Sequence, residues 1–431
     1  MATGISKTKW NGDLTLQSNN GNGLGVELTY NGKKLDLEIL HTQPADIRLL
    51  RKAKDNSKNR LYYGDNLPIL AFLLGDPDVK GNVRLVYIDP PFSTRSVFQS
   101  RSQTDAYQDL LAGAYYLEFL RERLILLREL LADDGSIYVH LDDNMVFHTK
   151  LIMDEIFGKS NFRNWITRKK CNPKNYTRKA YGNVSDYILF YTKTNKYIWN
   201  RPLEDWTTER ADKEYTYIEK NTGRRYKKVP IHAPGIRHGE TGRLWRGMNP
   251  PPGKHWQFTP KTLDEMDARG EIYWSPNGNP RRKIYFDQSE GIQVQDIWLE
   301  FKDAHNQMVK VSGYPTEKNP AMLERVIKTS SNPGDLVLDC FSGSGTTLAV
   351  ASQLKRTWIG IDNSQEAIAT TLRRFSKGLE RMGDFVKRAS EQTQSKLLDL
   401  HEPIGEFSFL TSLRDRREID SIGEIISKEF D

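Results

Sequence analysis

Cysteine is nearly absent from this 431-residue chain, which contains only Cys171 and Cys340. Two cysteines exclude a disulfide framework and a zinc site built from several cysteines, and they fit a reducing compartment. The chain also lacks any run of 18 apolar residues, which excludes a membrane-spanning helix. Residues 1–10 have no apolar core, so we expect no secretory signal. With a mean hydropathy of −0.65, the chain is predicted to be a soluble cytoplasmic protein.

Positive charge is in excess, with a net charge of +7 and a sequence pI near 9.0, which suggests a polyanionic partner. Residues 163–228 hold 17 Lys and Arg against 7 Asp and Glu, and tyrosines and tryptophans are interleaved with them. Such a segment is either a solvated face with ordinary core aromatics or a surface for nucleic acid. On the second interpretation, Arg168, Lys169 and Lys170 are candidates for DNA contact.

Strand and helix patterns alternate in two blocks, which predicts an α/β fold with a parallel sheet. We expect strands at 61–63, 83–88, 137–141, 336–340 and 358–361, and helices at 66–74, 107–131, 150–156, 321–329, 346–354 and 364–375. Regular periodicity fades over residues 196–295, which we interpret as an inserted module. The blocks therefore span 58–195 and 296–381. They are preceded by an appendage at 1–57 with a hairpin pattern at 24–40, and followed by a polar helical extension at 382–431.

The sequence Asp89-Pro90-Pro91-Phe92 directly follows the apolar strand pattern at 83–88. Open α/β sheets bind their ligands at the carboxyl ends of strands. Proline has a fixed φ and no N–H, so the carbonyls of Asp89 and Pro90 are held outward as acceptors beside a carboxylate. Phe92 adds a flat surface. Together these groups predict a cradle for a planar ring with an exocyclic amine, although a Pro-rich turn without function is the alternative.

A second motif follows the strand pattern at 336–340 and joins a glycine-rich turn to the start of a helix. Glycines allow close approach of the backbone to a ligand, and a helix N-terminus attracts an anion. The loop has neither a Gly-Lys-Ser/Thr sequence nor the third glycine of a dinucleotide fingerprint, since Leu348 stands there. An acid 17 residues after Gly345, Asp362, suits a ribose diol, and Asp65 can accept a bond from an adenine amine. S-adenosylmethionine fits these requirements. The candidate cofactor-binding residues are Asp65, Asp339, Phe341, Gly343, Gly345, Thr346, Thr347 and Asp362.

With these two motifs the chain resembles the β group of amino-group DNA methyltransferases, which use S-adenosylmethionine. In that family an Asp-Pro-Pro-Tyr/Phe turn holds the target amine and a Phe-x-Gly-x-Gly loop holds the cofactor. The turn at 89–92 precedes the loop at 341–345 here, an order typical of the β group and of the modification subunits of type III restriction–modification systems. Residues 118–131, 134–144, 154–162 and 314–325 also resemble the family. Asn319, between Lys318 and Pro320, and Cys340, where proline is frequent, depart from its pattern.

The resemblance implies a Rossmann-like methyltransferase sheet that is circularly permuted, with its catalytic half before its cofactor half and a target-recognition module between them. It implies a site-specific adenine-N6 methyltransferase that acts on double-stranded DNA. Such an enzyme is expected in the cytoplasm of a prokaryote, in association with the nucleoid. The resemblance also adds Thr316 and Lys318 to the cofactor site, and it allows a homodimer and a restriction-subunit partner. Cytosine-N4 methylation, RNA or protein amine methylation and non-catalytic DNA binding are the alternatives. Asp89 favours adenine, because the family more often uses Ser-Pro-Pro for cytosine.

The mechanism implied is the extrusion of an adenine from the duplex. Its amine hydrogens would then be accepted by the Asp89 carboxylate and the Pro90 carbonyl, while Phe92 stacks on the ring. The neighbouring pair Asp142-Asp143 is interpreted as strand-end structure rather than acid–base machinery. Within the module, Arg and Trp side chains can read or wedge DNA, or the tryptophans can form a local core. The candidates for DNA contact there are Arg243, Trp245, Arg246, Lys254, His255 and Trp256.

Overall fold

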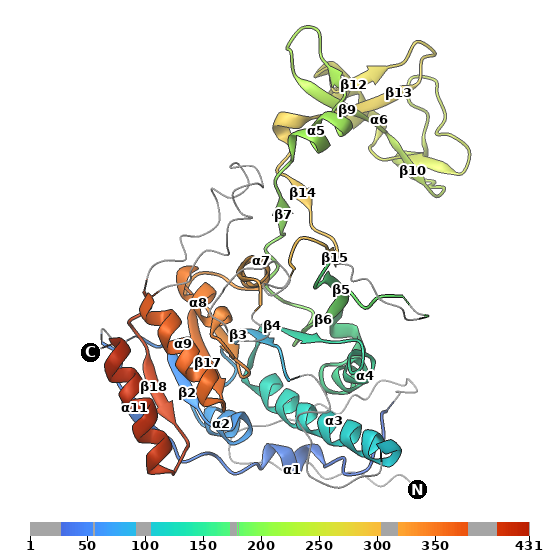
Figure 1. Cartoon of the computed structure of the whole chain (residues 1–431). Helices are drawn as coiled ribbons and strands as arrows, with labels where there is room; N and C mark the ends of the chain where they lie inside the picture. The colour runs from blue at the N-terminus through green and yellow to red at the C-terminus, as the bar shows by residue number, and fades with distance from the viewer. Residues whose placement is uncertain are drawn as a thin grey trace, which may run out of the picture.

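The chain forms an α/β body and a smaller module raised above it on two strands (Figure 1). This computed structural model describes residues 27–54, 57–91, 105–172, 179, 181–302, 318–377 and 403–430. Two of the predicted site residues, Phe92 and Thr316, lie outside these ranges. Within the described residues, no helix is both long and apolar enough to cross a membrane.

The body is built on one ten-stranded sheet. Its strands in spatial order are β1 (Arg48–Arg51), β18 (Ser408–Thr411), β2 (Arg60–Tyr63), β17 (Thr357–Asp362), β16 (Leu336–Asp339), β3 (Val83–Ile88), β4 (Leu131–Leu141), β6 (Ser185–Thr192), β5 (Phe162–Lys169) and β15 (Ile297–Trp298). The six strands from β18 to β4 run parallel, and β6 is antiparallel to both β4 and β5. The sequence did not predict β5 and β6, which lie in the basic aromatic segment.

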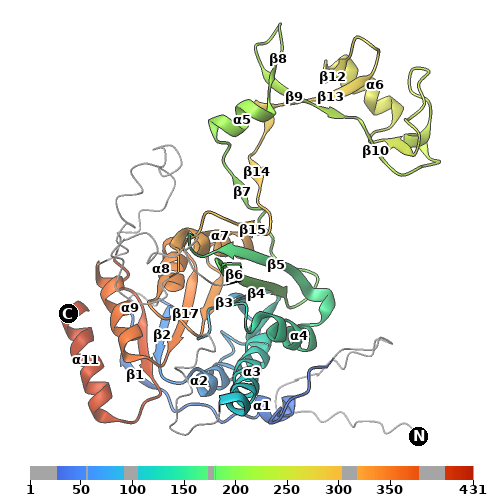
Figure 2. The same cartoon turned by 45° about the vertical axis from the view of Figure 1, so that its right-hand side comes forward.

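Helices cover both faces of this sheet, as Figure 2 shows from a second direction. One face carries α2 (Asn66–Leu73), α3 (Asp105–Leu130) and α4 (Val146–Phe157). The other carries α7 (Pro320–Ser330), α8 (Thr346–Gln353), α9 (Gln365–Lys377) and α11 (Arg416–Phe430). The leucines at three- and four-residue spacing in α3 are buried, and each such burial stabilises the fold by about 1.5–3 kcal/mol.

Strand β16, which precedes the glycine-rich turn, lies between β17 and β3, which precedes Asp89, although β3 is some 250 residues earlier in the chain. From β16 the chain passes through α8 to β17 on one side, whereas from β3 it passes through α3 to β4 on the other. A reversal of this kind is the topological switch point at which open α/β sheets bind ligands. The predicted permuted, Rossmann-like architecture is therefore confirmed.

The segments before and after the two predicted blocks contribute to the body's sheet. Strand β18 pairs in parallel with β2, and β1 pairs in antiparallel fashion with β18 at the sheet edge. The expectation of a purely helical C-terminal extension is wrong for residues 408–411, because Phe409 is fully buried in the core as part of β18.

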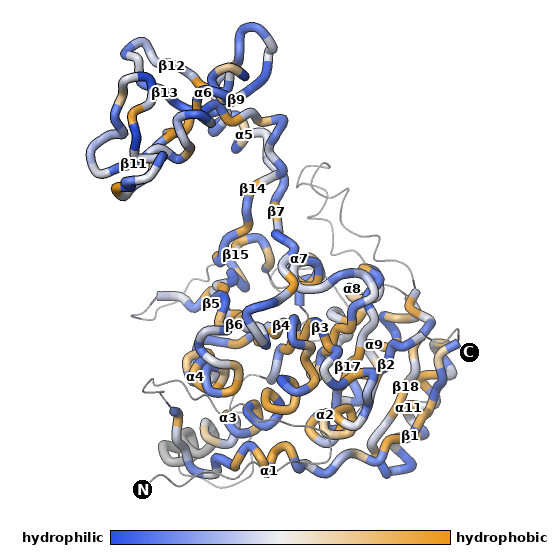
Figure 3. The backbone as a smooth tube through the Cα atoms, turned by 180° about the vertical axis from the view of Figure 1, so that it is seen from behind, coloured by the Kyte–Doolittle hydropathy of each residue, from blue (hydrophilic) through white to orange (hydrophobic). Residues whose placement is uncertain are grey.

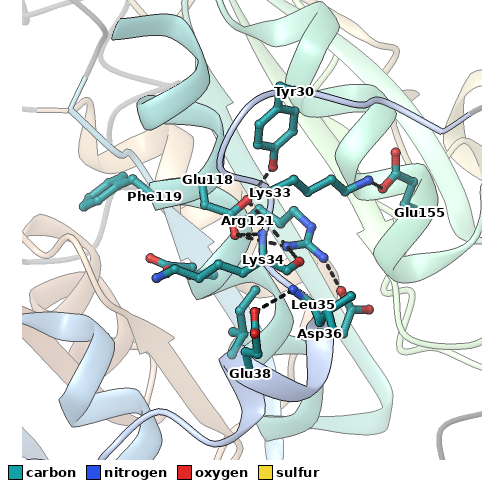
Figure 4. A network of polar contacts seen from close by, with 12 residues as sticks. Tyr30, Lys33, Lys34, Leu35, Asp36, Glu38, Glu118, Phe119, Arg121 and Glu155 are labelled. Carbon is teal, nitrogen blue, oxygen red and sulfur yellow. Dashed lines mark hydrogen bonds and ion pairs between the residues drawn. The ribbon is translucent and has the colours of Figure 1, made fainter. Parts of the chain in front are cut away.

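A hairpin was also predicted within residues 24–40, but the described part from residue 27 contains a turn and then helix α1 (Asp36–Leu40). The apparent alternation misled the prediction, because Leu35 and Leu37 are exposed and the adjacent pair Ile39 and Leu40 is buried. Polar contacts fasten this segment to α3 and α4, as Figure 4 shows. They join Tyr30 to Glu118 (2.6 Å), Lys33 to Glu155 (2.9 Å) and Asp36 to Arg121.

The inserted module, residues 203–293, rises on the paired strands β7 (Leu203–Glu204) and β14 (Ile292–Gln293). Above them lies a four-stranded antiparallel sheet in the order β12 (Ile272–Trp274), β13 (Pro280–Tyr285), β9 (Arg225–Pro230) and β8 (Tyr217–Ile218). Helices α5 (Thr208–Glu214) and α6 (Pro260–Ala268) and the pair β10 (His232–Pro234) and β11 (Lys254–Trp256) complete it. Figure 3 shows long hydrophilic stretches in this module, in keeping with its small separate core.

Candidate active site

Four parallel strands end at the same edge of the sheet, and a cavity of about 520 Å³ opens there. This volume is in the range typical of small-molecule sites. Ten of the residues predicted for the catalytic turn and cofactor site line it: Asp65, Asp89, Pro91, Lys318, Asp339, Phe341, Gly343, Thr346, Thr347 and Asp362. Pro90 is buried beside Asp89, and Gly345 caps helix α8 behind the loop.

The glycine loop between β16 and α8 closes one wall of the cavity. Gly343 has φ +51°, and its N–H donates to a carboxylate oxygen of Asp362 at 2.7 Å. Gly345 has φ +73°, and a Cβ there would lie 2.7 Å from the Thr371 side chain. Both positions therefore need glycine, as expected of a loop that must bring its backbone close to a ligand.

Two carboxylates, one buried and one half-buried, stand beside this loop. Burial raises the pKa of Asp339 to about 7; its side chain accepts a bond from the Phe341 N–H at 3.0 Å, and Asp89 and Asp362 lie near it. Burial also raises the pKa of Asp362, which accepts a second bond from the Ser364 N–H at 2.9 Å. A carboxylate has about four lone-pair sites, so Asp362 retains acceptor capacity for a ribose hydroxyl.

The carboxylate of Asp89 has two oxygens in different situations. Oδ2 lies 2.9 Å from Nζ of Lys318, and the two side chains are 19% and 9% exposed. Oδ1 is buried and has no hydrogen-bond partner among the residues that the structure describes. A buried acceptor without a partner is costly and rare in folded proteins. Because Asp89 lines the cavity, Oδ1 is a fitting acceptor for a ligand N–H.

The charges of the cavity wall suit a cationic ligand. Its ionisable lining consists of four carboxylates and two cations: Asp65, Asp89, Asp339, Asp362, Arg123 and Lys318. S-adenosylmethionine carries a sulfonium, an ammonium and one carboxylate. The excess of acidic groups, and the Asp89 oxygen that bonds to no described residue, fit this cofactor together with an amine substrate.

The lining residues that sequence reasoning missed include Asn66, Phe119 and Arg123, which lie outside the two predicted turns. Arg123 is buried, donates from Nε to Asn66 Oδ1 at 2.5 Å, and places a terminal nitrogen 3.1 Å from Oδ1 of Asp65. Its guanidinium lies 3.6 Å from the Phe119 ring centroid, and Phe119 contacts Phe341 of the loop. The available signal was an arginine directly beside the leucine stripe of α3, a position that usually requires a buried partner.

Arg168, a predicted DNA contact, lies in the interior, and this prediction is corrected. Its side chain has no exposed surface, donates from Nη1 to Asp186 Oδ2 at 2.9 Å, and donates from Nε to the Phe301 carbonyl at 2.6 Å. Asp186 also lies 3.0 Å from His140, which bonds the Tyr87 hydroxyl at 2.8 Å beside the cavity. Arginine is retained inside because its charge is paired. Lys169 and Lys170 are half-buried at the end of β5.

Three further DNA candidates, Trp245, His255 and Trp256, are also buried, so contact through their side chains is corrected as well. Trp245 stacks on Trp274 with centroids 5.3 Å apart and donates its indole N–H to Asp264 at 2.9 Å. The tryptophans form the module's own core, which was the alternative interpretation. The other candidates remain predictions: Arg243 and Lys254 are exposed, and Arg246 pairs with Asp264 and Asp267.

Comparison with known proteins gives a match over residues 83–373 to the family model described as DNA methylase. Type II methyltransferase M.EcaI of Enterobacter cloacae is 48% identical over 388 residues, which cover 88% of this chain and 84% of that protein. The Mod subunit of the type III restriction–modification enzyme StyLTI of Salmonella typhimurium is 28% identical over 330 residues, covering 68% of this chain and 49% of the subunit. Among solved structures, the M1.HpyAVI–SAM complex has 17% identity and a TM-score of 0.40, covering 73% of this chain and 98% of that one.

The matched segment begins with β3 and ends within α9, so it contains both the Asp89 turn and the glycine loop that meet at the cavity. The expected resemblance and the dependence on S-adenosylmethionine are thereby confirmed. The family includes enzymes that methylate adenine N6 and enzymes that methylate cytosine N4. This chain belongs to the DNA methylase family and is a DNA methyltransferase of the restriction–modification type.

Proposed function

We propose that this chain methylates N6 of adenine in double-stranded DNA, with Asp89 as the principal acceptor for the target amine. The proposal rests above all on Asp89 Oδ1, which is buried without a hydrogen-bond partner among the described residues and belongs to the lining of the same cavity as the glycine loop. The other oxygen is engaged by Lys318, so within the described part of the chain Oδ1 is left as an acceptor for an incoming N–H.

S-adenosylmethionine, when bound, supplies an electrophilic methyl group on a sulfonium. The chain's own groups orient the amine: Asp89 Oδ1 and the Pro90 carbonyl accept its two hydrogens. Phe92, which lies outside the described residues, is proposed from the sequence to stack on the ring. Orientation of both reactants is a large part of the rate acceleration. The same acceptors stabilise the positive charge that develops on the nitrogen. The target base has to leave the duplex first, at a cost of a few kcal/mol.

Adenine is proposed over cytosine because Asp stands at position 89, where the family more often has Ser in cytosine-N4 enzymes. Both bases present an exocyclic amine, so acceptor geometry alone supports either one. The direct test is mass spectrometry of nucleosides from DNA treated with the chain and cofactor. N6-methyladenine is expected, and N4-methylcytosine without N6-methyladenine would refute adenine as the target.

Replacement of Asp89 by Asn tests the catalytic role. The amide can still accept a bond from Lys318, but the charged acceptor for the amine is lost. We expect kcat to fall by about 10²–10³, the usual effect of removing one group that stabilises transition-state charge, with cofactor affinity retained. Asp143→Asn is the matched control, since Asp143 is exposed at the end of β4. Wild-type turnover by Asp89→Asn would exclude the carboxylate as the key acceptor.

We also propose that the chain acts without a nuclease subunit. It covers 84% of M.EcaI, which is a methyltransferase by name, but only 49% of the StyLTI Mod subunit. The purified chain should therefore methylate DNA unaided. Light scattering of the same preparation tests the predicted homodimer, and activity that depends on an added partner would contradict the proposal.

A further inference from the structure

The four-stranded sheet of the inserted module has one covered and one open face. Ile272 and Trp274, on the covered face, pack with Trp245, Trp256 and residues of helix α6. In an antiparallel sheet, neighbouring paired residues share a face and successive residues alternate. Tyr273 therefore points to the opposite face from Ile272 and Trp274.

Strand register places a row of tyrosines and cations on that open face. Tyr273 of β12 pairs with Arg281 of β13, Lys283 pairs with Lys228 of β9, and Tyr217 of β8 pairs with Tyr226. Tyr217 is 43% exposed, Arg281 is exposed, and Lys228 and Tyr273 are half-buried. Nζ of Lys228 lies 3.6 Å from the centroid of Tyr217 and 3.5 Å from that of Tyr273. The row thus crosses the whole sheet.

On this side of the module Lys283 pairs with Glu219 at 2.8 Å, but other cations have no carboxylate partner among the described residues. Lys228, Lys254 and Arg281 form no ion pair within the described part of the chain, whereas Arg224 and Arg225 pair with Asp287 and Asp212. The positive charge also reaches His232 of β10. Its pKa is lowered first by burial and then by the charges of Lys254 and Arg281. Cations without a carboxylate partner among the described residues suit a polyanion, whose counterions they displace.

The width of the face also fits duplex DNA. Strands are about 4.8 Å apart, so the row from β8 to β12 spans roughly 14 Å, and a major groove is about 12 Å wide. Lysine, arginine and tyrosine are residues that commonly contact the sugar–phosphate backbone. A row of this length can reach phosphates on both sides of one groove.

We propose that this open face, formed by Tyr217, Lys228, Tyr273 and Arg281 with Lys254 at its margin, contacts the phosphate backbone of double-stranded DNA. The inference rests on the proposed function and specifies the surface by which the module holds its substrate. The face replaces the buried tryptophans as the contact surface. Because phosphate contacts carry no base information, it positions the duplex rather than reading its sequence.

The test is fluorescence anisotropy of labelled duplexes of unrelated sequence with the full chain over a range of salt concentrations. Loss of one phosphate contact lowers the slope of log K against log salt by about one. We expect Lys228→Gln and Arg281→Gln each to lower the slope by about one and the double variant by about two, equally for all duplexes. Lys261→Gln is the matched control, since Lys261 is exposed but lies on α6, at the covered face.

Folding of each variant is checked by cofactor binding, because the cofactor site lies in the body. If Lys228→Gln disturbs the module, Arg281→Gln decides the matter, because Arg281 is exposed and forms no ion pair within the described residues. An unchanged salt slope in both variants, while the wild type binds and methylates DNA, would overturn this surface and leave the proposed function intact. Failure of the wild type itself to methylate DNA would instead refute the proposed function.

Discussion

The ion pair between Lys318 and Asp89 allows a quantitative prediction. Nζ and Oδ2 are 2.9 Å apart, and both side chains are largely shielded from water. At an effective dielectric constant of about 20, Coulomb attraction at this distance is roughly 6 kcal/mol. Desolvation offsets much of it, and removal of one partner from a buried pair typically costs about 3–5 kcal/mol. Because Asp89 retains 19% exposure, we expect the lower end, about 3 kcal/mol, for Lys318→Met.

The catalytic effect should be larger than the effect on cofactor binding. Without Lys318 the Asp89 carboxylate has no partner for either oxygen among the described residues, so its orientation is lost. Misplacement of a reacting group by about 1 Å can lower the rate by about 10²-fold. Lys318→Met should therefore lower kcat by about 10²-fold, with a smaller change in the cofactor Kd.

Denaturant unfolding, titration calorimetry with cofactor, and steady-state methylation measure these three quantities. Lys328→Met is the matched control, because Lys328 forms an exposed pair with Glu324 that should contribute only about 0.2–1 kcal/mol. The double variant Asp89→Asn, Lys318→Met should be more stable than Lys318→Met alone, since it no longer buries an uncompensated charge. Equal stability losses for Lys318→Met and Lys328→Met, or additive losses in the double variant, would refute the reasoning.

Three further outcomes follow from the geometry. Because the pKa of Asp339 is raised to about 7, its carboxyl carries a proton at low pH, and binding of a cationic cofactor must release that proton. The affinity for the cofactor should therefore rise between about pH 6 and pH 8, and Asp339→Asn should remove this pH dependence in calorimetry. Arg168→Met should destabilise the fold by about 3–5 kcal/mol by removing the buried guanidinium that pairs with Asp186, with no change in the salt slope of DNA binding; a lowered slope at normal stability would contradict this. Gly345→Ala should weaken cofactor binding about tenfold or more, because the new Cβ would meet the Thr371 side chain and displace the loop. Gly334→Ala is the control, since the space around its Cβ is open, and equal cofactor affinities of the two variants would contradict the need for glycine at position 345.

Local sequence patterns were sufficient to predict both functional turns, at 89–92 and 341–345. Asp89 and Asp362 each follow an apolar strand pattern, and parallel strands that end in acids meet at one edge of a sheet whatever their distance in the chain. The leucine spacing of α3 likewise predicted a helix within two residues of its observed bounds, Asp105–Leu130. In these cases the physical cause, burial of a periodic apolar face, is contained in the segment itself.

Predictions that required a side chain to be exposed to solvent were less accurate. Arg168, Trp245 and Trp256 were candidates for DNA contact because of their residue types, but all three are buried. Residue type does not reveal whether a distant acid such as Asp186 neutralises an arginine. The hairpin prediction around Asn31 was also wrong because local alternation does not reveal burial. Ile39 packs against the body, and the segment Asp36–Leu40 is helical.

The sequence by itself determined the order of the two turns, the residue types available to bind an amine and a cofactor, and the position of the inserted module, because these depend on short patterns. Only the tertiary structure decided which oxygen of Asp89 Lys318 engages, that Arg123 lines the cavity, and that tyrosines and cations share one open face of the module. These features arise from contacts between residues far apart in the chain, such as Asp89 with Lys318 and Tyr217 with Lys228 and Tyr273. Burial and charge pairing at such contacts are properties of the packed whole and not of any single segment.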